Sequence, residues 1–255
     1  MITDYLREEE YLIEVCANST ESGVEAQGGG ALRIELCAGI PEGGTTPSYG
    51  EILAARRHLQ IAINVIIRPR GGDFLYNDYE VEAMLADIRM CKEIGVDGVV
   101  FGALTPDGDI DMQVCRRLKE EAAFLSTTFH RAFDVCRNPQ KALDAIIELG
   151  FDRLLTSGQA PTAPEGAALI RSLNEQSAGR VIIMPGCGVN ENNIARLRAD
   201  TGCREFHMSA RHSVESGMKY RNPAVSMGGT VQISEYSRDV TDSSRVRNSL
   251  NALKG

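Results

Sequence analysis

Hydrophobic positions along the chain follow two patterns that alternate eight times. Short apolar runs begin near Leu12, Leu32, Ala62, Asp97, Ser126, Asp152, Val181 and Glu205. Between successive runs, apolar residues recur every three or four positions, which is the period of a helix. Strand and helix therefore alternate along the chain, and no hairpin signal joins any two strands.

Helix starts are marked by polar residues that can cap a first turn. Three pairs have capping-box spacing, and one cap precedes a proline: Ser48 with Glu51, Asn77 with Glu80, Thr162 with Glu165, and Asn138 before Pro139. The spacing predicts helices that begin at these positions.

Eight strand–helix units in 255 residues predict a TIM barrel, a (β/α)8 fold of the α/β class that forms one domain over residues 1–255. A final helix around Val246, Leu250 and Leu253 would close it. A doubly wound open sheet is the alternative. Residues 1–10 are expected to form a flexible N-terminal extension, and residues 210–240 a long loop after the eighth strand.

Charge and composition indicate which classes of partner and which compartment to expect. The formal net charge of −8 disfavours nucleic acid, which normally binds a basic face. The N-terminus has no apolar signal region, and no run approaches a membrane span, so we expect a cytoplasmic protein that does not enter the membrane. Seven cysteines, an odd number, indicate reduced thiols rather than a disulfide framework.

The first two strands end in the same pattern, Glu14-Val15-Cys16 and Glu35-Leu36-Cys37. Because side chains alternate along a strand, each Glu shares a face with its Cys, and this polar face should point into the barrel mouth. Neighbouring strands lie about 4.8 Å apart, so the two thiolates could share one soft ion such as Cu(I). Two alternatives remain: both cysteines are small buried hydrophobes, or they form a disulfide, which a reducing compartment disfavours.

The third strand breaks off abruptly at Arg68-Pro69-Arg70-Gly71-Gly72-Asp73. If the strand continues through the two arginines, both project to one face, where their guanidinium groups could grip a carboxylate or phosphate. The alternative is that both arginines are solvated at the surface.

Proton-transfer groups are predicted at other strand ends. The fifth strand ends at His130, and Asp134 follows in the loop. His130, with Glu35 and Asp73 across the mouth, could act as an acid–base group, although a lone histidine is more often structural.

The seventh and eighth strands suggest an anion site. The run Gly186-Cys187-Gly188 follows strand seven, where many barrels bind phosphate, and strand eight carries His207, Ser209 and Arg211. Gly186, Gly188, Ser209 and Arg211 thus join Arg68 and Arg70 as predicted anion-binding residues.

Several motifs, spread in order from about Leu12 to Tyr236, resemble the CutC family of copper homeostasis proteins. They are Glu35-Leu36-Cys37, Glu42-Gly43-Gly44-Thr45-Thr46-Pro47-Ser48, Ile67-Arg68-Pro69-Arg70-Gly71-Gly72-Asp73-Phe74, Phe129-His130-Arg131-Ala132-Phe133-Asp134, Leu155-Thr156-Ser157-Gly158 and Glu235-Tyr236-Ser237. The resemblance implies a TIM barrel, a cytoplasmic homo-oligomer, which we expect to be a dimer or tetramer, and a Cu(I) site on Cys16 and Cys37. In relatives we expect a residue smaller than Cys187 at that position.

Two functional hypotheses follow. The first is a CutC-like copper homeostasis protein that binds Cu(I) through the two strand-end cysteines. The second is a TIM-barrel enzyme that acts on a small anionic, possibly phosphorylated, metabolite. The cysteines favour the first hypothesis, and the cluster of arginines around His130 favours the second.

Overall fold

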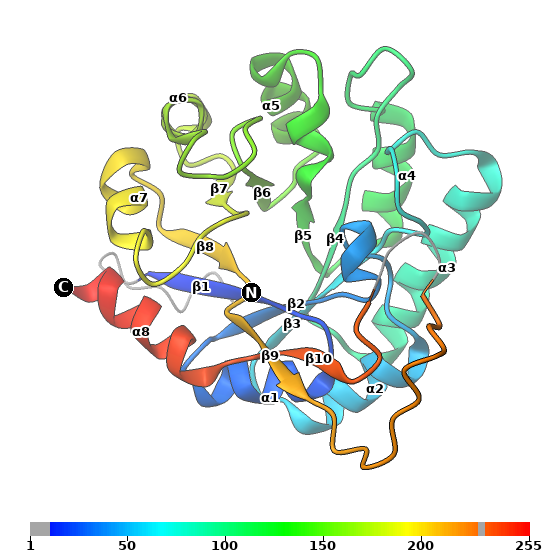
Figure 1. Ribbon diagram of the computed structural model, residues 1–255. Helices are drawn as coiled ribbons and strands as arrows, with labels where there is room; N and C mark the ends of the chain where they lie inside the picture. Colours follow the sequence, from blue (N-terminus) through cyan, green and yellow to red (C-terminus); the bar gives the residue numbers. More distant parts are fainter. Residues whose placement is uncertain (1–10, 229–232) are drawn as a thin grey trace.

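Eight parallel strands form a nearly closed barrel in the computed structural model, which describes residues 11–228 and 233–255 (Figure 1). The strands are β1 (Leu12–Ala17), β2 (Arg33–Leu36), β3 (Ala62–Ile66), β4 (Gly98–Phe101), β5 (Ser126–Phe129), β6 (Arg153–Thr156), β7 (Ile182–Pro185) and β8 (Glu205–Met208). Hydrogen-bonded neighbours run in the order β7-β6-β5-β4-β3-β2-β1-β8, and β7 also contacts β8. The predicted TIM barrel is confirmed, and the open-sheet alternative is wrong.

A helix follows each of the first seven barrel strands, an eighth helix ends the chain, and these helices pack on the outside of the barrel (Figure 1). The helices are α1 (Thr20–Gly28), α2 (Tyr49–His58), α3 (Asp78–Ile94), α4 (Met112–Glu121), α5 (Pro139–Glu148), α6 (Ala167–Ser177), α7 (Ile194–Thr201) and α8 (Ser243–Lys254). The last is the predicted closing helix, which buries Val246 and Leu253. No helix among the described residues is both long and apolar enough to cross a bilayer.

Most of the predicted helix starts are confirmed. Asn77 accepts from the Glu80 amide and closes a full capping box, Ser48 caps α2, and Asn138 caps α5. The exception is Thr162, whose hydroxyl bonds Glu165 although α6 begins only at Ala167. The capping pattern there stabilises a turn that precedes the helix.

Because side chains alternate along each strand, the buried residues form two groups, one between the strands and the helices and one inside the barrel. Val15 and Leu36 are fully buried in the apolar layer between strands and helices. The interior carries an ionic cluster instead: Arg33 bonds both Glu14 and Glu205 at 2.5 Å, and Arg153 bonds Glu205 at 2.7 Å. These four side chains are almost completely buried, and their opposite charges balance. Glu14 therefore points inward, as expected, but pairs with Arg33 in this cluster.

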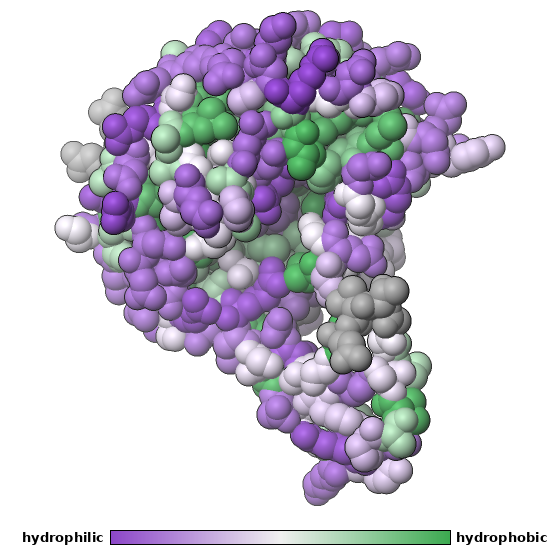
Figure 2. Space-filling model, turned by 45° about the horizontal axis from the view of Figure 1, so that its top comes forward, coloured by the Kyte–Doolittle hydropathy of each residue, from purple (hydrophilic) through white to green (hydrophobic). Residues whose placement is uncertain are grey.

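The predicted loop over 210–240 contains regular structure at both ends. Strands β9 (Arg211–Glu215) and β10 (Ser237–Thr241) pair antiparallel as a two-stranded ribbon. Most of their side chains are partly or fully exposed, so the sequence lacks the apolar alternation of a buried strand. The described residues of the connecting arm are 216–228 and 233–236, and Figure 2 shows this arm as a lobe that projects from the body. The predicted extension over residues 1–10 and residues 229–232 of the arm lie outside the described residues.

Candidate functional site

A cavity of about 420 Å³ opens at the C-terminal ends of the strands. Eight of the residues that the sequence predicted for a site line this cavity. They are Cys16, Glu35, Cys37, Arg68, His130, Gly188, Ser209 and Arg211. Its apolar lining includes Ile40, Ile66, Phe74, Leu155, Val189 and Met208. The barrel topology thus brings residues from seven strands, all except β4, or from the loops that follow them into one site.

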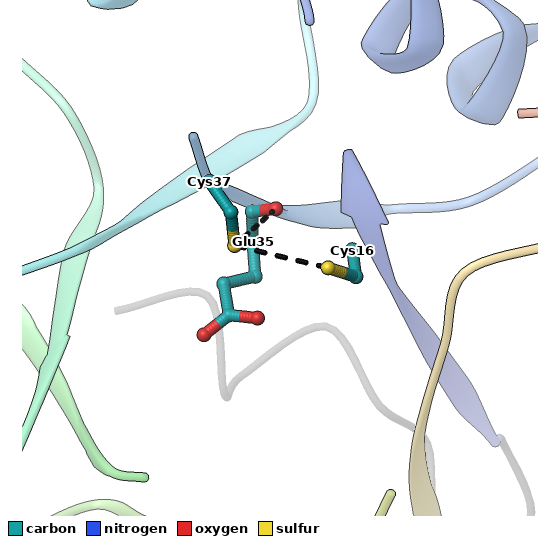
Figure 3. Close-up of side chains that lie close together, drawn as sticks. All are labelled: Cys16, Glu35 and Cys37. Atoms are coloured by element: carbon teal, nitrogen blue, oxygen red, sulfur yellow. Dashed lines mark hydrogen bonds between the residues drawn. The ribbon is translucent and has the colours of Figure 1, made fainter. Parts of the chain in front are cut away.

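The two strand-end cysteines face each other inside this cavity. Their Sγ atoms lie 3.7 Å apart, and both thiols are free (Figure 3). The β1–β2 ladder sets this contact, because Cys16 pairs in register with Glu35 and the amide of Cys37 donates to Ala17. The hydrogen bond from Cys37 lowers the pKa of the Cys16 thiol. The same bond, together with burial, raises the pKa of the Cys37 thiol well above its usual value.

These donors fit a soft metal ion. Ligand atoms of Cys16, Glu35 and Cys37 all lie within 4.8 Å of one another. If each metal–sulfur bond is about 2.3 Å, as for zinc thiolates, sulfur atoms 3.7 Å apart can hold one ion at a bent angle. Thiolates are the ligands that Cu(I) prefers, whereas carboxylate oxygens suit harder ions.

The Glu35 carboxylate is already bound to another side chain. His207 Nε2 lies 2.8 Å from Glu35 Oε2, and both side chains are largely buried. Burial alone would lower the pKa of His207, but the charge of Glu35 and its hydrogen bond outweigh it and raise that pKa to about 9. The same pairing outweighs burial for Glu35 and keeps its pKa below the usual value. At neutral pH this is an ion pair beside the thiols.

His130 also lines the cavity and is uncharged at neutral pH. It caps the 3₁₀ helix η3 (Arg131–Val135), where its Nδ1 accepts from the Ala132 amide at 3.3 Å. Burial, followed by the charge of Arg68, lowers the pKa of His130 to about 4. With Nδ1 as the acceptor, Nε2 carries the proton. This Nε2 is buried and has no partner among the described residues.

The two arginines of the third strand end are separated, contrary to the expectation that they share one face. Strand β3 stops at Ile66, so alternation no longer governs the residues that follow. Arg68 is 4% exposed, lines the cavity and stacks on Phe74, with its guanidinium carbon 4.9 Å from the ring centre. Its Nη1 donates to the carbonyls of Glu42 and Gly44, which lie in the loop after β2.

Arg70 lies outside the cavity lining. Its Nε bonds Glu80 at 2.5 Å and its Nη2 bonds Asp73 at 3.0 Å, and the side chain is 38% exposed. Asp73 is 71% exposed and likewise does not line the cavity. The structure therefore places Arg70 and Asp73 together at the surface, away from His130.

The 186–188 segment differs from a simple phosphate loop. The Gly186 amide donates to Thr156 and so extends the β6–β7 ladder. A side chain at Gly186 would come within 2.5 Å of Leu155, which explains why glycine stands there. Gly188 lines the cavity with a φ of +75°. Cys187, with a φ of +76°, lines it as well and lies 3.2 Å from the Pro161 carbonyl oxygen.

Arg211, the first residue of β9, reaches toward the thiols. Its Nη2 lies 3.6 Å from Cys16 Sγ, and its carbonyl accepts from Arg245. Arg245 lines the cavity from α8 and is paired with Glu191. Sequence reasoning missed Arg245 because its helix is predicted only from apolar spacing. Ser209 lies on the same rim as Arg211.

The sequence matches a known family over most of its length. The model of the CutC family matches residues 11–212. A family protein CutC from Bacteroides thetaiotaomicron is 60% identical over 245 residues, which cover 96% of this chain and 98% of the relative. The human copper homeostasis protein cutC homolog is 52% identical and is matched over 95% of this chain and 89% of its own length.

A solved structure shows the same fold. The crystal structure of the CutC protein from Streptococcus agalactiae superposes with a TM-score of 0.75 at 35% identity. The match covers 78% of this chain and 98% of that one.

Proposed function

The chain belongs to the CutC copper homeostasis family, and from this premise we propose that it binds Cu(I) through Cys16 and Cys37. The observation that supports the proposal most directly is the 3.7 Å separation of the two Sγ atoms inside the cavity. Cu(I) prefers thiolates, and the lowered pKa of Cys16 makes that thiol the easier one to deprotonate. Copper is the cargo of this site.

The surroundings of the pair also suit a singly charged ion. Glu35 is neutralised by His207, so it adds little net charge next to the thiols. Arg211, which contacts Cys16, would offset the negative charge that two thiolates bring. Ile66 packs against both cysteines and limits their contact with water.

The test is competition for Cu(I) between the reduced protein and a chelator of known affinity. We expect the Cys16→Ser, Cys37→Ser double variant to lose affinity by more than the ~10–100-fold that follows loss of an outer partner of a metal site. A matched control, Cys136→Ser with Cys203→Ser, removes two buried thiols that do not line the cavity and should bind as wild type does. Equal affinities for all three proteins would rule out this site.

The single variant Cys187→Ser tests whether the third thiol at the mouth takes part. Its sulfur already lies 3.2 Å from the Pro161 carbonyl oxygen. We therefore expect unchanged Cu(I) affinity in this variant, whereas a large loss would add Cys187 to the ligand set.

We also infer that the protein is a cytoplasmic homo-oligomer, a dimer or tetramer, as the family resemblance implies. Large apolar side chains on the arm support association, since Tyr220 is 77% and Met227 is 84% exposed. Light scattering after size exclusion measures the mass directly. Wild type should exceed the 27.7 kDa of one chain, and a monomer at micromolar concentration would contradict the inference.

A second candidate function, an enzyme acting on a small anionic metabolite, is favoured by His130. A buried imidazole with a free N–H inside a cavity can transfer a proton, and Glu35 lines the same cavity. Asp73 does not line the cavity, so we leave it out of this candidate function. A panel of phosphorylated and carboxylated metabolites should then include one that wild type converts and His130→Gln does not.

A further inference from the structure

Four arginines line the cavity, and within residues 11–228 and 233–255 two of them have a carboxylate partner. Arg131 bonds Asp134 at 2.7 Å, and Arg245 bonds Glu191 at 3.0 Å. Arg68 forms its hydrogen bonds to backbone carbonyls, and Arg211 to Cys16 Sγ. Among the described residues, neither of these two has a carboxylate within 4.0 Å. Two guanidinium charges therefore face the cavity without a protein counter-charge of their own.

Some buried N–H groups of the residues that line the cavity also have no hydrogen-bond acceptor in the described part of the chain. The Nε atoms of Arg68 and Arg211 and the Nε2 of His130 are buried and lack a partner within the described part of the chain. Arg68 is 4% and His130 is 3% exposed. The centre of the Phe74 ring lies 4.9 Å from the guanidinium carbon of Arg68 and 4.9 Å from the centre of the His130 ring. A buried donor without a partner is costly, and the cost is relieved when a ligand accepts from it.

We propose that the cavity binds a small organic anion through these three N–H groups, with a carboxylate or phosphate as the group that accepts from them. Two guanidinium groups select a negative charge over a neutral acceptor, and arginine forms its strongest hydrogen bonds with carboxylate and phosphate oxygens. The apolar wall, which includes Ile40, Leu155 and Val189, contacts the rest of the molecule. A cavity of about 420 Å³ has room for both the charged group and the apolar part of a small organic anion.

The site differs in two ways from the one that the sequence predicts. The proposed set of binding residues contains His130 and not Arg70, because Arg70 is bound to Glu80 outside the cavity. The Gly186 amide is excluded because it already donates to Thr156. The inference goes beyond copper binding and requires neither the thiols nor turnover, since none of the three donors belongs to a proposed metal ligand.

The experiment is a titration of the reduced, metal-free protein at constant ionic strength, followed by the ¹H–¹⁵N resonances of the arginine Nε–H groups. Inorganic phosphate and benzoate serve as separate probes, so that the two classes of anion are distinguished, and benzyl alcohol is the neutral control. We expect at least one anion to shift the Arg68 and Arg211 resonances in a saturable way, and benzyl alcohol to leave them unchanged.

Arg211→Met is the decisive variant. Arg68 is less suitable for substitution because it donates hydrogen bonds to two loops, at the carbonyls of Glu42 and Gly72, and its loss would disturb the fold. Loss of one hydrogen bond to a charged group weakens binding at least about tenfold, and we expect this for Arg211→Met and for His130→Phe. Arg70→Met is the matched control and should bind within about twofold of wild type. Unfolding midpoints confirm that each variant is folded.

The outcomes separate this inference from copper binding. The Cys16→Ser, Cys37→Ser variant should keep the anion site, whatever its Cu(I) affinity. Shifts that do not saturate, or that are equal in wild type and Arg211→Met, would overturn the inference. An effect of Arg70→Met as large as that of Arg211→Met would assign the response to general surface charge and overturn it as well.

Discussion

Replacing His207 with glutamine should change how stability depends on pH. In the folded protein the Glu35 carboxylate raises the pKa of His207 to about 9, whereas an unfolded histidine titrates near 6.5. The folded state therefore holds this proton more tightly. Its contribution to stability is complete below pH 6.5 and is lost as the pH rises toward 9.

The size of the effect follows from the difference between the two pKa values. The two pKa values differ by roughly 2.5, and at about 1.4 kcal/mol per pKa unit this difference corresponds to roughly 3.5 kcal/mol. The His207 side chain is 12% exposed, so solvent screens the pair little. About 1 kcal/mol of this should remain at pH 8, where most of the unfolded chains have lost the proton. Higher pH is avoided because a second group would then titrate. Burial raises the pKa of Cys115 to about 12 in the folded protein, so above pH 8 this thiol loses its proton mainly in the unfolded chain, which lowers stability further.

Urea unfolding of wild type and His207→Gln at pH 6.5 and pH 8 measures this difference. The gap in unfolding free energy between the two proteins should shrink by about 2 kcal/mol over this range. His58→Gln, which removes an exposed histidine, is the control and should follow wild type. A gap that stays constant with pH would refute the reasoning, because Glu35 and His207 would then not form an ion pair in the folded protein.

Three further predictions concern the barrel interior. Arg33→Met leaves the Glu14 carboxylate buried without its arginine and should cost about 3–5 kcal/mol of unfolding free energy in urea. Gly98→Ala should lower the melting temperature by several degrees, since the new methyl would lie 2.3 Å from Asn64 Oδ1. Gly50→Ala, in α2 with open space around it, should leave the melting temperature unchanged or raise it.

The sequence was most informative where local alternation decides the outcome. The two E-x-C strand ends placed Cys16 and Cys37 in the barrel mouth because side chains alternate with a period of two and consecutive strands are neighbours. The same rule failed for Arg70, since the chain leaves strand β3 at Ile66 and the loop turns that side chain toward Glu80.

Contacts that depend on register around the barrel could not be predicted. Arg33 and Glu205 are separated by 172 positions, and the same separation divides Glu35 from His207. Nothing local in the sequence indicates that strands one, two and eight align these side chains. The β9–β10 ribbon was missed for a different reason, because its exposed strands lack a buried face.

Anomalous X-ray scattering at the copper edge tests most directly whether Cys16 and Cys37 together hold Cu(I), as we propose. Crystals of reduced protein loaded with one equivalent of Cu(I) should show a single strong peak between the two Sγ atoms, in contact with both. No peak there, or a stronger one at Cys187 or at the surface, would contradict the account.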